Sequence, residues 1–579
     1  MNRKNMTAAV LAGLAGIAGI AGTAQAVNLN PDGLGQVLIY PYYTSNGGNQ
    51  TILSVVNTTD SSKAVKVRFL EGFNSREVLD FNLYLSPWDV WGAAIYDDAG
   101  VPTLAIIDDS CTVPYLYGDF GGNQAFLSLA YNDNAVFDSD GGPTGIERAA
   151  EGHFEMIEMG TVIDGSVTAA SIEHVSHDVL DDDDEVIDTF WAPGDCDELV
   201  EAWTRNADYS NLGRWTWDAT EDLSRNSGGL FGGAAIVNAN NGTMYSYDAL
   251  AIQGYDKSNG RRHEEPGTTR PSLNQGTEHT ATIFFGVPQN RAVDLVYNRS
   301  VGAISALFMH ENIMNEYTIN PILGASTEWV VTFPTKNFYV DELHIATTSI
   351  WVPDGAGDLE CNSWIEGEPY PIYDGEPDPN PVEDIGWEGC SYIEVPNSAS
   401  GAIHPFTEVF EGTACETAGL ETWDRDERSF DEKRSGTRPP VVSPSIPGDC
   451  DPEIQFCGST VFQLCYEVNV LRFGDGVIFD TPAMMEGQNG LLLSITPASG
   501  PDAEPFDNGW GRINFGADRH HQDGNGLIGL PTIGFAAFEF ENDFVDGAGI
   551  KAFYGGLFGH KGNVRRKELH YSCDDCSPD

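Results

Sequence analysis

Apolar and polar residues alternate with a period of two along much of the chain. Val65, Val67 and Phe69 alternate with Lys66 and Arg68. This pattern predicts a β-strand with one face in the core and the other in water.

Further segments share this alternation, and we expect strands at residues 51–57, 78–85, 88–96, 103–107, 280–285, 329–333, 343–351, 463–473, 491–495 and 533–540. A turn is predicted at residues 97–100, and Asn241-Gly242 predicts a type I′ hairpin. The main helix signal is at residues 197–205, with Asp195 or Asp197 as the cap.

Many short strands with 64 Gly and 31 Pro predict an all-β protein. Its length of 579 residues exceeds that of one ordinary sandwich. We expect two β-sandwich, immunoglobulin-like domains with long loops, at residues 27–220 and 229–579. Residues of about 353–451 are interpreted as a loop-rich acidic insertion, rich in Cys, Pro and Gly.

The first 26 residues have the pattern of a secretory signal peptide. Arg3 and Lys4 precede an apolar run, and Ala24-Gln25-Ala26 supplies a cleavage site. A membrane anchor is the alternative, but the run is rich in Gly and Ala and barely long enough to span a bilayer. No other stretch predicts a membrane span. We therefore expect a periplasmic, extracellular or cell-surface protein.

Ten cysteines, an even number, agree with an oxidising compartment. Cys111 and Cys196 are the expected pair in the first half of the chain, because the other eight lie beyond residue 360. Cys361 and Cys390 bracket a Pro- and Gly-rich loop and form a second candidate pair. The remaining six permit fifteen pairings, between which the sequence does not decide.

The chain carries a formal net charge of −57, which disfavours nucleic acid as a partner. No Lys or Arg occurs between residues 149 and 204 or between 337 and 424, whereas Lys561, Arg565, Arg566 and Lys567 cluster near the C-terminus. This asymmetry suggests two alternatives: the basic tail contacts the acidic face of another copy, or it pairs with acids of its own chain.

Two acidic stretches are candidate calcium sites. Asp138, Asp140 and Glu147 surround a Gly-rich turn, although Val136 stands where an EF-hand needs its first carboxylate. An ordinary β-turn is the alternative there.

The second stretch contains Asp181 and Asp183, in a run of five acids that follows His174 and His177. A solvated loop is the alternative, and two histidines three apart on a strand would face opposite sides. Calcium is the one cofactor that these stretches suggest.

Signatures of common enzymes are missing: the sequence holds no G-x-S-x-G elbow, no H-E-x-x-H and no Walker loop. Carboxylate pairs of glycosidases leave no short motif, so their chemistry stays open. The pattern favours a protein that is not an enzyme.

Four stretches resemble a family of exported β-rich proteins of Gram-negative bacteria that has no assigned activity. They are GLGQVLIYPYYT at Gly33, REVLDFNLYLSPWDVW at Arg76, GLFGGAAIVNANNGTMYSYDAL at Gly229 and TEWVVTFPTK at Thr327. The resemblance implies export and a β fold, and it implies no chemistry.

Our first hypothesis is therefore a secreted, non-enzymatic protein of the envelope or extracellular matrix. It would act through surface contacts with other copies, with surface glycans or with cations. The alternative is a carbohydrate-active enzyme or carbohydrate-binding module. A cleft where acids meet exposed aromatic rings would favour the alternative, and flat faces with exposed strand edges would favour the first.

The signal peptide generates the first prediction. Exported protein should begin at Val27, because cleavage should follow Ala26. N-terminal sequencing and intact mass measure the start of the chain. A retained leader in the membrane fraction would show that the apolar run is an anchor.

Overall fold

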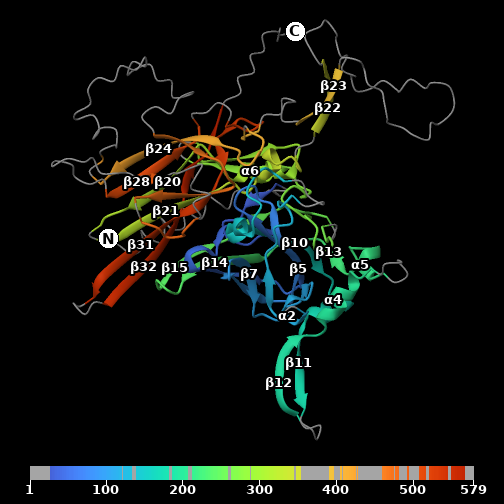
Figure 1. Cartoon of the computed structure of the whole chain (residues 1–579). Helices are drawn as coiled ribbons and strands as arrows, with labels where there is room; N and C mark the ends of the chain where they lie inside the picture. The colour runs from blue at the N-terminus through green and yellow to red at the C-terminus, as the bar shows by residue number, and fades with distance from the viewer. Residues whose placement is uncertain are drawn as a thin grey trace, which may run out of the picture.

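The computed structural model describes residues 26–119, 121–133, 139–180, 186–205, 212–258, 262–286, 289–321, 323–344, 347–353, 390–396, 404–406, 408–425, 427, 460–474, 476–481, 492–493, 507–516, 521–545 and 550–567. Within these ranges the protein is mostly strands in several antiparallel sheets, as the alternation predicted (Figure 1).

Two large sheets contain most strands of the first half of the chain. Sheet 1 has the order β1 (Asn28–Leu29), β16 (Leu250–Gln253), β2 (Val37–Thr44), β10 (Glu151–Val162), β4 (Lys63–Glu71), β5 (Glu77–Leu85) and β8 (Thr112–Val113), and β13 (Leu223–Ser224) pairs with β10. Sheet 2 has the order β15 (Thr243–Asp248), β14 (Leu230–Asn238), β3 (Asn49–Asn57), β6 (Val90–Asp98), β7 (Val101–Ile106) and β9 (Asn123–Ala125).

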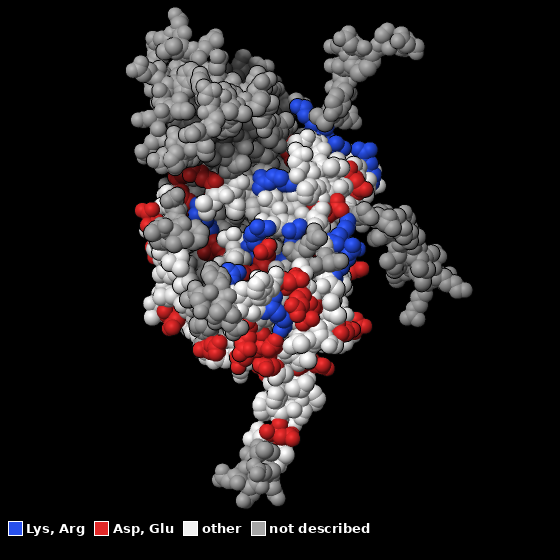
Figure 2. All heavy atoms as spheres, turned by 90° about the vertical axis from the view of Figure 1, so that its right-hand side faces the viewer, with Lys and Arg blue, Asp and Glu red and all other residues white. Residues whose placement is uncertain are grey.

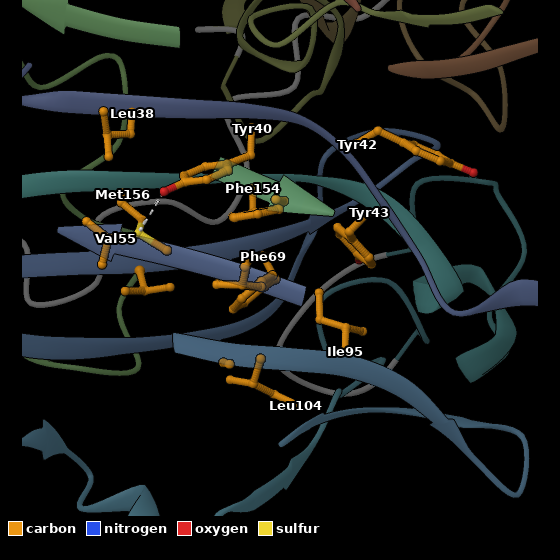
Figure 3. Packing of buried hydrophobic residues seen from close by; sticks show 14 of the residues in the cluster. Leu38, Tyr40, Tyr42, Tyr43, Val55, Phe69, Ile95, Leu104, Phe154 and Met156 are labelled. Atoms are coloured by element: carbon orange, nitrogen blue, oxygen red, sulfur yellow. Dashed lines mark hydrogen bonds between the residues drawn. The ribbon is translucent and has the colours of Figure 1, made fainter. Parts of the chain in front are cut away.

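Sheets 1 and 2 face each other across one apolar layer (Figure 3). Tyr40 of β2 stacks on Phe154 of β10, with 4.1 Å between ring centroids. The Tyr40 hydroxyl also lies 3.7 Å from the sulfur of Met156 and donates to the backbone oxygen of Ser54 at 2.8 Å. These contacts join both sheets, because Ser54 belongs to β3.

A second pair of sheets contains strands of the other half. Sheet 3 has the order β25 (Thr460–Leu464), β24 (Glu416–Asp424), β28 (Asn508–Asn514), β20 (Asn312–Thr318) and β33 (Lys561–Asn563). Sheet 4 has the order β27 (Leu492–Leu493), β26 (Val468–Phe473), β21 (Ala325–Thr332), β31 (Ile533–Val545) and β32 (Ile550–Gly559). An apolar cluster around Trp329 and Phe473 lies between these two sheets.

The smaller elements complete the described chain. Five two-stranded sheets are formed by β11 (His174–Leu180) with β12 (Val186–Pro193), β17 (Thr280–Phe285) with β18 (Arg291–Val296), β19 (Met309–His310) with β30 (Leu530–Pro531), β22 (Thr347–Pro353) with β23 (Cys390–Pro396), and β29 (Leu527–Ile528) with β34 (Arg565–Arg566). The helices are η1 (Asn46–Gly48), α2 (Leu116–Asp119), η2 (Ile146–Ala150), α3 (Val167–Ile172), α4 (Cys196–Ala202), α5 (Arg214–Trp217), α6 (Ser300–Leu307) and α7 (Asn337–Val340).

Sheet 4 packs against the core of sheets 1 and 2, so the halves of the chain share apolar contacts. Tyr42 of β2 contacts Phe479 and Phe535 at centroid distances of 5.1 and 6.3 Å. Tyr247 of β15 stacks on Phe535 at 5.3 Å. The Thr332 hydroxyl of β21 donates to the backbone oxygen of Pro41 at 2.7 Å.

Strand pairs also cross the boundary predicted at residues 218–229. β14, β15 and β16 follow it in the chain, yet β14 pairs with β3 and β16 with β2. In addition, β24 belongs to the stretch interpreted as an insertion and forms an inner strand of sheet 3.

Local predictions were confirmed to different degrees. The helix is present as α4, and the Asp195 side chain caps it by accepting from the Glu198 N–H. The hairpin at Asn241-Gly242 is present, but the type I′ prediction was wrong. Four residues connect Asn238 to Thr243, and Gly242 alone among these has a positive φ, of 70°. A two-residue hairpin loop in which both residues have a positive φ occurs instead at Ala99-Gly100, with φ of 54° and 92°.

The prediction that one face of β4 lies in water was also wrong. All nine residues of this strand are buried. Val65, Val67 and Phe69 lie in the core between sheets 1 and 2, and Lys66 and Arg68 are enclosed in ion pairs on the opposite face. Lys63 and Glu71, at the two ends of the strand, form buried ion pairs on the side of the core residues.

Arg148 forms one of the fully buried ion pairs. Its guanidinium binds Glu71 through Nε and Nη2 at 2.7 and 2.8 Å, and Asp140 through Nη1 and Nη2 at 2.9 and 2.6 Å. Its charge also lies 4.4 Å from the ring centroid of Tyr131. These groups are almost completely buried, so Arg148 neutralises two carboxylates that have little contact with bulk solvent.

The network around Arg148 reaches the second half of the chain. Asn74 donates to Asp140 at 3.1 Å and to Asp341, just after α7, at 2.8 Å. Asp341 in turn accepts from Nη2 of Arg76 at 2.9 Å and from its Nε. We call Glu71, Asn74, Arg76, Asp140, Arg148 and Asp341 the ionic junction.

Replacing Arg148 with Met should therefore destabilise the fold strongly. The change leaves Glu71 and Asp140 buried without their cation, which typically costs about 3–5 kcal/mol. Urea unfolding measures the loss. Arg205→Met is the matched control, because Arg205 pairs with Glu265 but is 49% exposed, and its loss should stay below about 1 kcal/mol. Equal losses in both variants would contradict this role of the ionic junction.

Candidate functional site

The outer face of sheet 1 carries a layer of buried charges. Arg68 of β4 lies between Glu155 of β10, with which its Nη1 pairs, and Glu77 of β5, whose Oε2 lies 2.7 Å from its Nε. Lys66 of β4 pairs with Asp80 of β5. We call these five residues the charged layer. Alternation in three neighbouring strands places them on one face.

Residues 262–275 close over part of the charged layer. The Gly267 N–H donates to Asp80 at 2.9 Å, and Asn82 donates to the backbone oxygen of Glu264 at 3.0 Å. Beside this cover a pocket of about 650 Å³ opens. Its lining includes Arg76, Glu77, Asp80, Leu127, Arg270 and His344.

Burial dominates the electrostatics of this pocket. It raises the pKa of Glu77 to about 7, although the neighbouring Arg68 lowers it. Burial, together with Arg68 and Arg76, lowers the pKa of His344 to about 4, so this imidazole is neutral at physiological pH. The lining contains no aromatic ring apart from His344, and both of its carboxylates already have a cation partner.

A second feature is the hairpin of β11 and β12, which projects from the body (Figure 1). Its strands pair only with each other within the described chain. A strand of seven residues reaches about 23 Å. Isolated hairpins are marginally stable in water, so the root of this arm needs support.

The root of the arm is fixed on both sides. β11 follows α3, and β12 leads into α4, where the backbone N–H of Gly194 donates to the oxygen of Glu173 at 3.0 Å. The Cys111–Cys196 disulfide, which confirms the predicted pair, joins the start of α4 to the residue preceding β8. The disulfide therefore ties the arm to sheet 1.

One face of the arm is apolar apart from His177 and Asp188. The register pairs Val175 with Ala192, His177 with Phe190 and Val179 with Asp188, which places these residues on the same side. Phe190 is 51% exposed and its ring stacks on His177 at 5.3 Å. Val175 and Val179 are each 37% exposed. The visible arm surface is largely uncharged (Figure 2).

The calcium candidates do not come together in the described chain. Asp140 is held by Arg148, whereas Glu147 is an exposed residue of η2. Asp138, Asp181 and Asp183 lie outside the described residues. His174 and His177 lie on β11 on opposite faces, as a strand requires. No group of three or more His, Cys, Asp or Glu able to hold a metal occurs among the residues described.

The structure also shows where several other residues named in the sequence predictions lie. Cys415 and Cys465 form a disulfide, one of the pairings left open by the sequence. The Cys361 pairing with Cys390 lies outside the described side chains. In the basic tail, Arg565 pairs with Glu311 of its own chain at 2.8 Å, which favours the intrachain alternative for this residue. No described helix is both long and apolar enough to cross a membrane.

Comparison with known proteins gives no relative: no family model, no curated protein and no solved structure matches the chain. The resemblance to exported Gram-negative proteins therefore rests on its four motifs.

Sequence reasoning missed the charged layer and the arm. A signal for the layer was present, because Lys66 and Arg68 sit on a strand whose neighbours in the sheet carry acids at matching positions. The acids that lie opposite Lys66 and Arg68 can be identified only when the pairing of β4 with β5 and β10 is known. For the arm, the signal is the apolar run of β12, VIDTFWAP, directly after five acids.

Glu77 should make the folding stability depend on pH. Its pKa rises from 4.5 to about 7 on folding, so the stability that its protonated form contributes is lost as pH rises through this range. The free energy of unfolding of Glu77→Gln, relative to the wild type, should thus increase by up to about 3 kcal/mol between pH 4.5 and 7.5. Urea titrations at several pH values measure it.

Glu265→Gln is the control for this comparison, because Glu265 lies in an exposed pair. An exposed pair contributes less than about 1 kcal/mol, so this variant should differ little from the wild type at any pH. If Glu77→Gln and the wild type keep a constant difference across the range, then folding does not raise the pKa of Glu77.

Proposed function

We propose that the protein is a secreted, non-enzymatic component of the cell envelope or extracellular matrix, and that it acts by binding other copies of itself through the β11–β12 arm. The observation that carries this proposal is the projecting, tethered hairpin with exposed apolar side chains. Exposed apolar patches of this kind mark interaction sites in soluble proteins.

The chemistry of the arm favours a second arm as its partner. Both of its edges have free backbone donors and acceptors within the described chain, which can pair with another strand. Two arms that meet by their Val175, Val179 and Phe190 faces would remove these side chains from water. A two-fold arrangement with the arms antiparallel keeps the acidic runs at residues 181–185 of the two copies apart.

The alternative, a carbohydrate-active enzyme, finds less support in the pocket. Glu77 and Asp80 line it, but each is bound to a cation of β4. Exposed indole rings, such as Trp191 and Trp217, lie outside its lining. This pocket therefore does not combine acids with exposed aromatic rings, which is the combination expected of a carbohydrate-active enzyme.

The proposal has three further parts. Export follows from the signal peptide and the resemblance. An immunoglobulin-like arrangement of the paired sheets is supported by their antiparallel strands and shared apolar layers. Calcium binding by the acidic stretches, including Asp181 and Asp183, would relieve repulsion between copies of a chain of charge −57.

Replacing Phe190 with Asp should weaken self-association. The change places a charge in the centre of the apolar arm face, where a second arm would bury it, so the dissociation constant should rise at least tenfold. Sedimentation velocity across a concentration series measures it. Trp217→Asp is the control, because Trp217 is 77% exposed on α5, away from the arm.

Association should be stronger with millimolar calcium than with sodium at the same ionic strength if the acidic stretches bind the ion. A wild-type chain that stays monomeric at every concentration, with and without calcium, would refute the proposal. Unchanged association of Phe190→Asp would show that copies meet elsewhere than on the arm.

A further inference from the structure

The outer face of sheet 3 carries aromatic and charged side chains that point away from the core. Leu420 of β24 and Ile513 of β28 point into the core between sheets 3 and 4. Because side chains alternate, Trp423 and Trp510 on the same two strands point to the opposite face.

These two tryptophans form a stacked pair. Trp423 and Trp510 are directly opposite in the register, and their rings lie 4.2 Å apart at an interplanar angle of 14°. Trp510 remains 38% exposed. The Arg512 guanidinium lies 5.4 Å from the ring centroid of Trp423. We call these two rings with Arg512 and its partner Glu421 the indole platform.

Polar groups surround the exposed indole. Arg512 is held by Glu421, whose Oε2 accepts from its Nε at 2.7 Å and lies 2.6 Å from its Nη2. Glu316 of β20 is exposed and directly opposite Trp510 on the other side. A flat apolar ring is thus bordered by one fixed guanidinium and by carboxylates, all on the same face of an antiparallel sheet.

Packing within the protein explains only part of this arrangement. A cross-strand aromatic pair contributes about 0.2–1 kcal/mol to a sheet. Towards the core, the same strand carries glycine on either side of Trp510. At Gly511 a side chain would meet Trp329 at 3.1 Å, and at Gly509 it would meet the backbone oxygen of Trp423. The neighbours of Trp510 on the core side of β28 therefore have no side chain, whereas the large indole of Trp510 faces solvent.

This surface suits a sugar ring. A hexopyranose with equatorial hydroxyls presents a flat C–H face that packs on an indole, while its hydroxyls lie in the ring plane and reach planar polar groups at the border. Arg donates to such hydroxyls and Glu accepts from them. The strong negative charge of the chain disfavours polyanionic glycans.

We propose that the indole platform binds neutral glycans built from equatorially substituted hexopyranoses, such as β-glucans. The site goes beyond the self-association proposed for the arm, and it uses residues of another sheet. Trp510 stacks on the sugar ring, Trp423 supports Trp510 from behind, and Arg512 and Glu421 bind the hydroxyls.

Titration of the full chain with cellohexaose tests the proposal. Intrinsic fluorescence and calorimetry should show saturable binding by the wild type. Trp510→Ala should weaken it at least tenfold. Trp510→Leu should weaken it comparably, because it keeps an apolar contact with Trp423 but has no flat ring face, and it serves if the alanine variant fails to fold. Trp217→Ala, at an exposed tryptophan elsewhere, should bind as the wild type does.

Two results would overturn the proposal. One is the absence of saturable binding of cellohexaose or of soluble β-glucan to the wild-type chain. The other is unchanged affinity in a folded Trp510 variant. The Phe190→Asp variant should bind cellohexaose normally, so failure of the glycan proposal and failure of the arm proposal are distinguishable.

Discussion

The fold depends on the neutralisation of buried carboxylates by a small number of cations. The chain has 87 acidic and 30 basic residues, and in the described part of the chain six of the basic side chains, Lys63, Lys66, Arg68, Arg76, Arg148 and Lys336, are buried. Arg148 shows the constraint most clearly, because it holds Glu71 and Asp140 with four hydrogen bonds among almost completely buried side chains. Buried ion pairs add little net stability over apolar packing, but they penalise any arrangement that separates them.

The buried ion pairs therefore specify which strands and loops meet. Arg68 requires both β5 and β10 as neighbours, because its partners Glu77 and Glu155 come from these strands. Arg76 requires Asp341, which lies 265 residues away in the sequence. Together with the aromatic contacts of Tyr42 with Phe479 and Phe535, the ionic junction makes the two halves one body.

Much of the secondary structure could be predicted from the sequence. Alternation in β4 and β17 gave strands close to those observed, and capping chemistry gave α4. The burial of the charged face of β4 could not be predicted, because Glu155 of β10 pairs with Arg68 only through long-range strand pairing. The turn at Asn241-Gly242 was predicted as a two-residue loop, whereas Asn238 accepts from the backbone N–H groups of residues 240 and 241 and supports a longer one.

The candidate sites reflect where charged and apolar side chains lie in the fold, with paired acids in the interior and apolar side chains on parts of the surface. Every carboxylate of the charged layer and of the ionic junction has a cation partner, and the two carboxylates that line the pocket are among them. On the surface, the arm and the indole platform are two of the places where apolar groups meet solvent, on a chain whose net charge otherwise opposes contact between copies. The sequence showed the acids and the tryptophans, but only the strand register brings Trp423 next to Trp510 and Phe190 next to His177.

The claim that the ionic junction unites the halves is tested most directly by native-state hydrogen exchange in low urea. The slowest amides of β10 in sheet 1 and of β21 in sheet 4 should share one opening free energy and the same dependence on urea, because both exchange only by global unfolding. A β21 that opens at a lower free energy while β10 stays protected would show that the halves unfold independently, and would contradict the account.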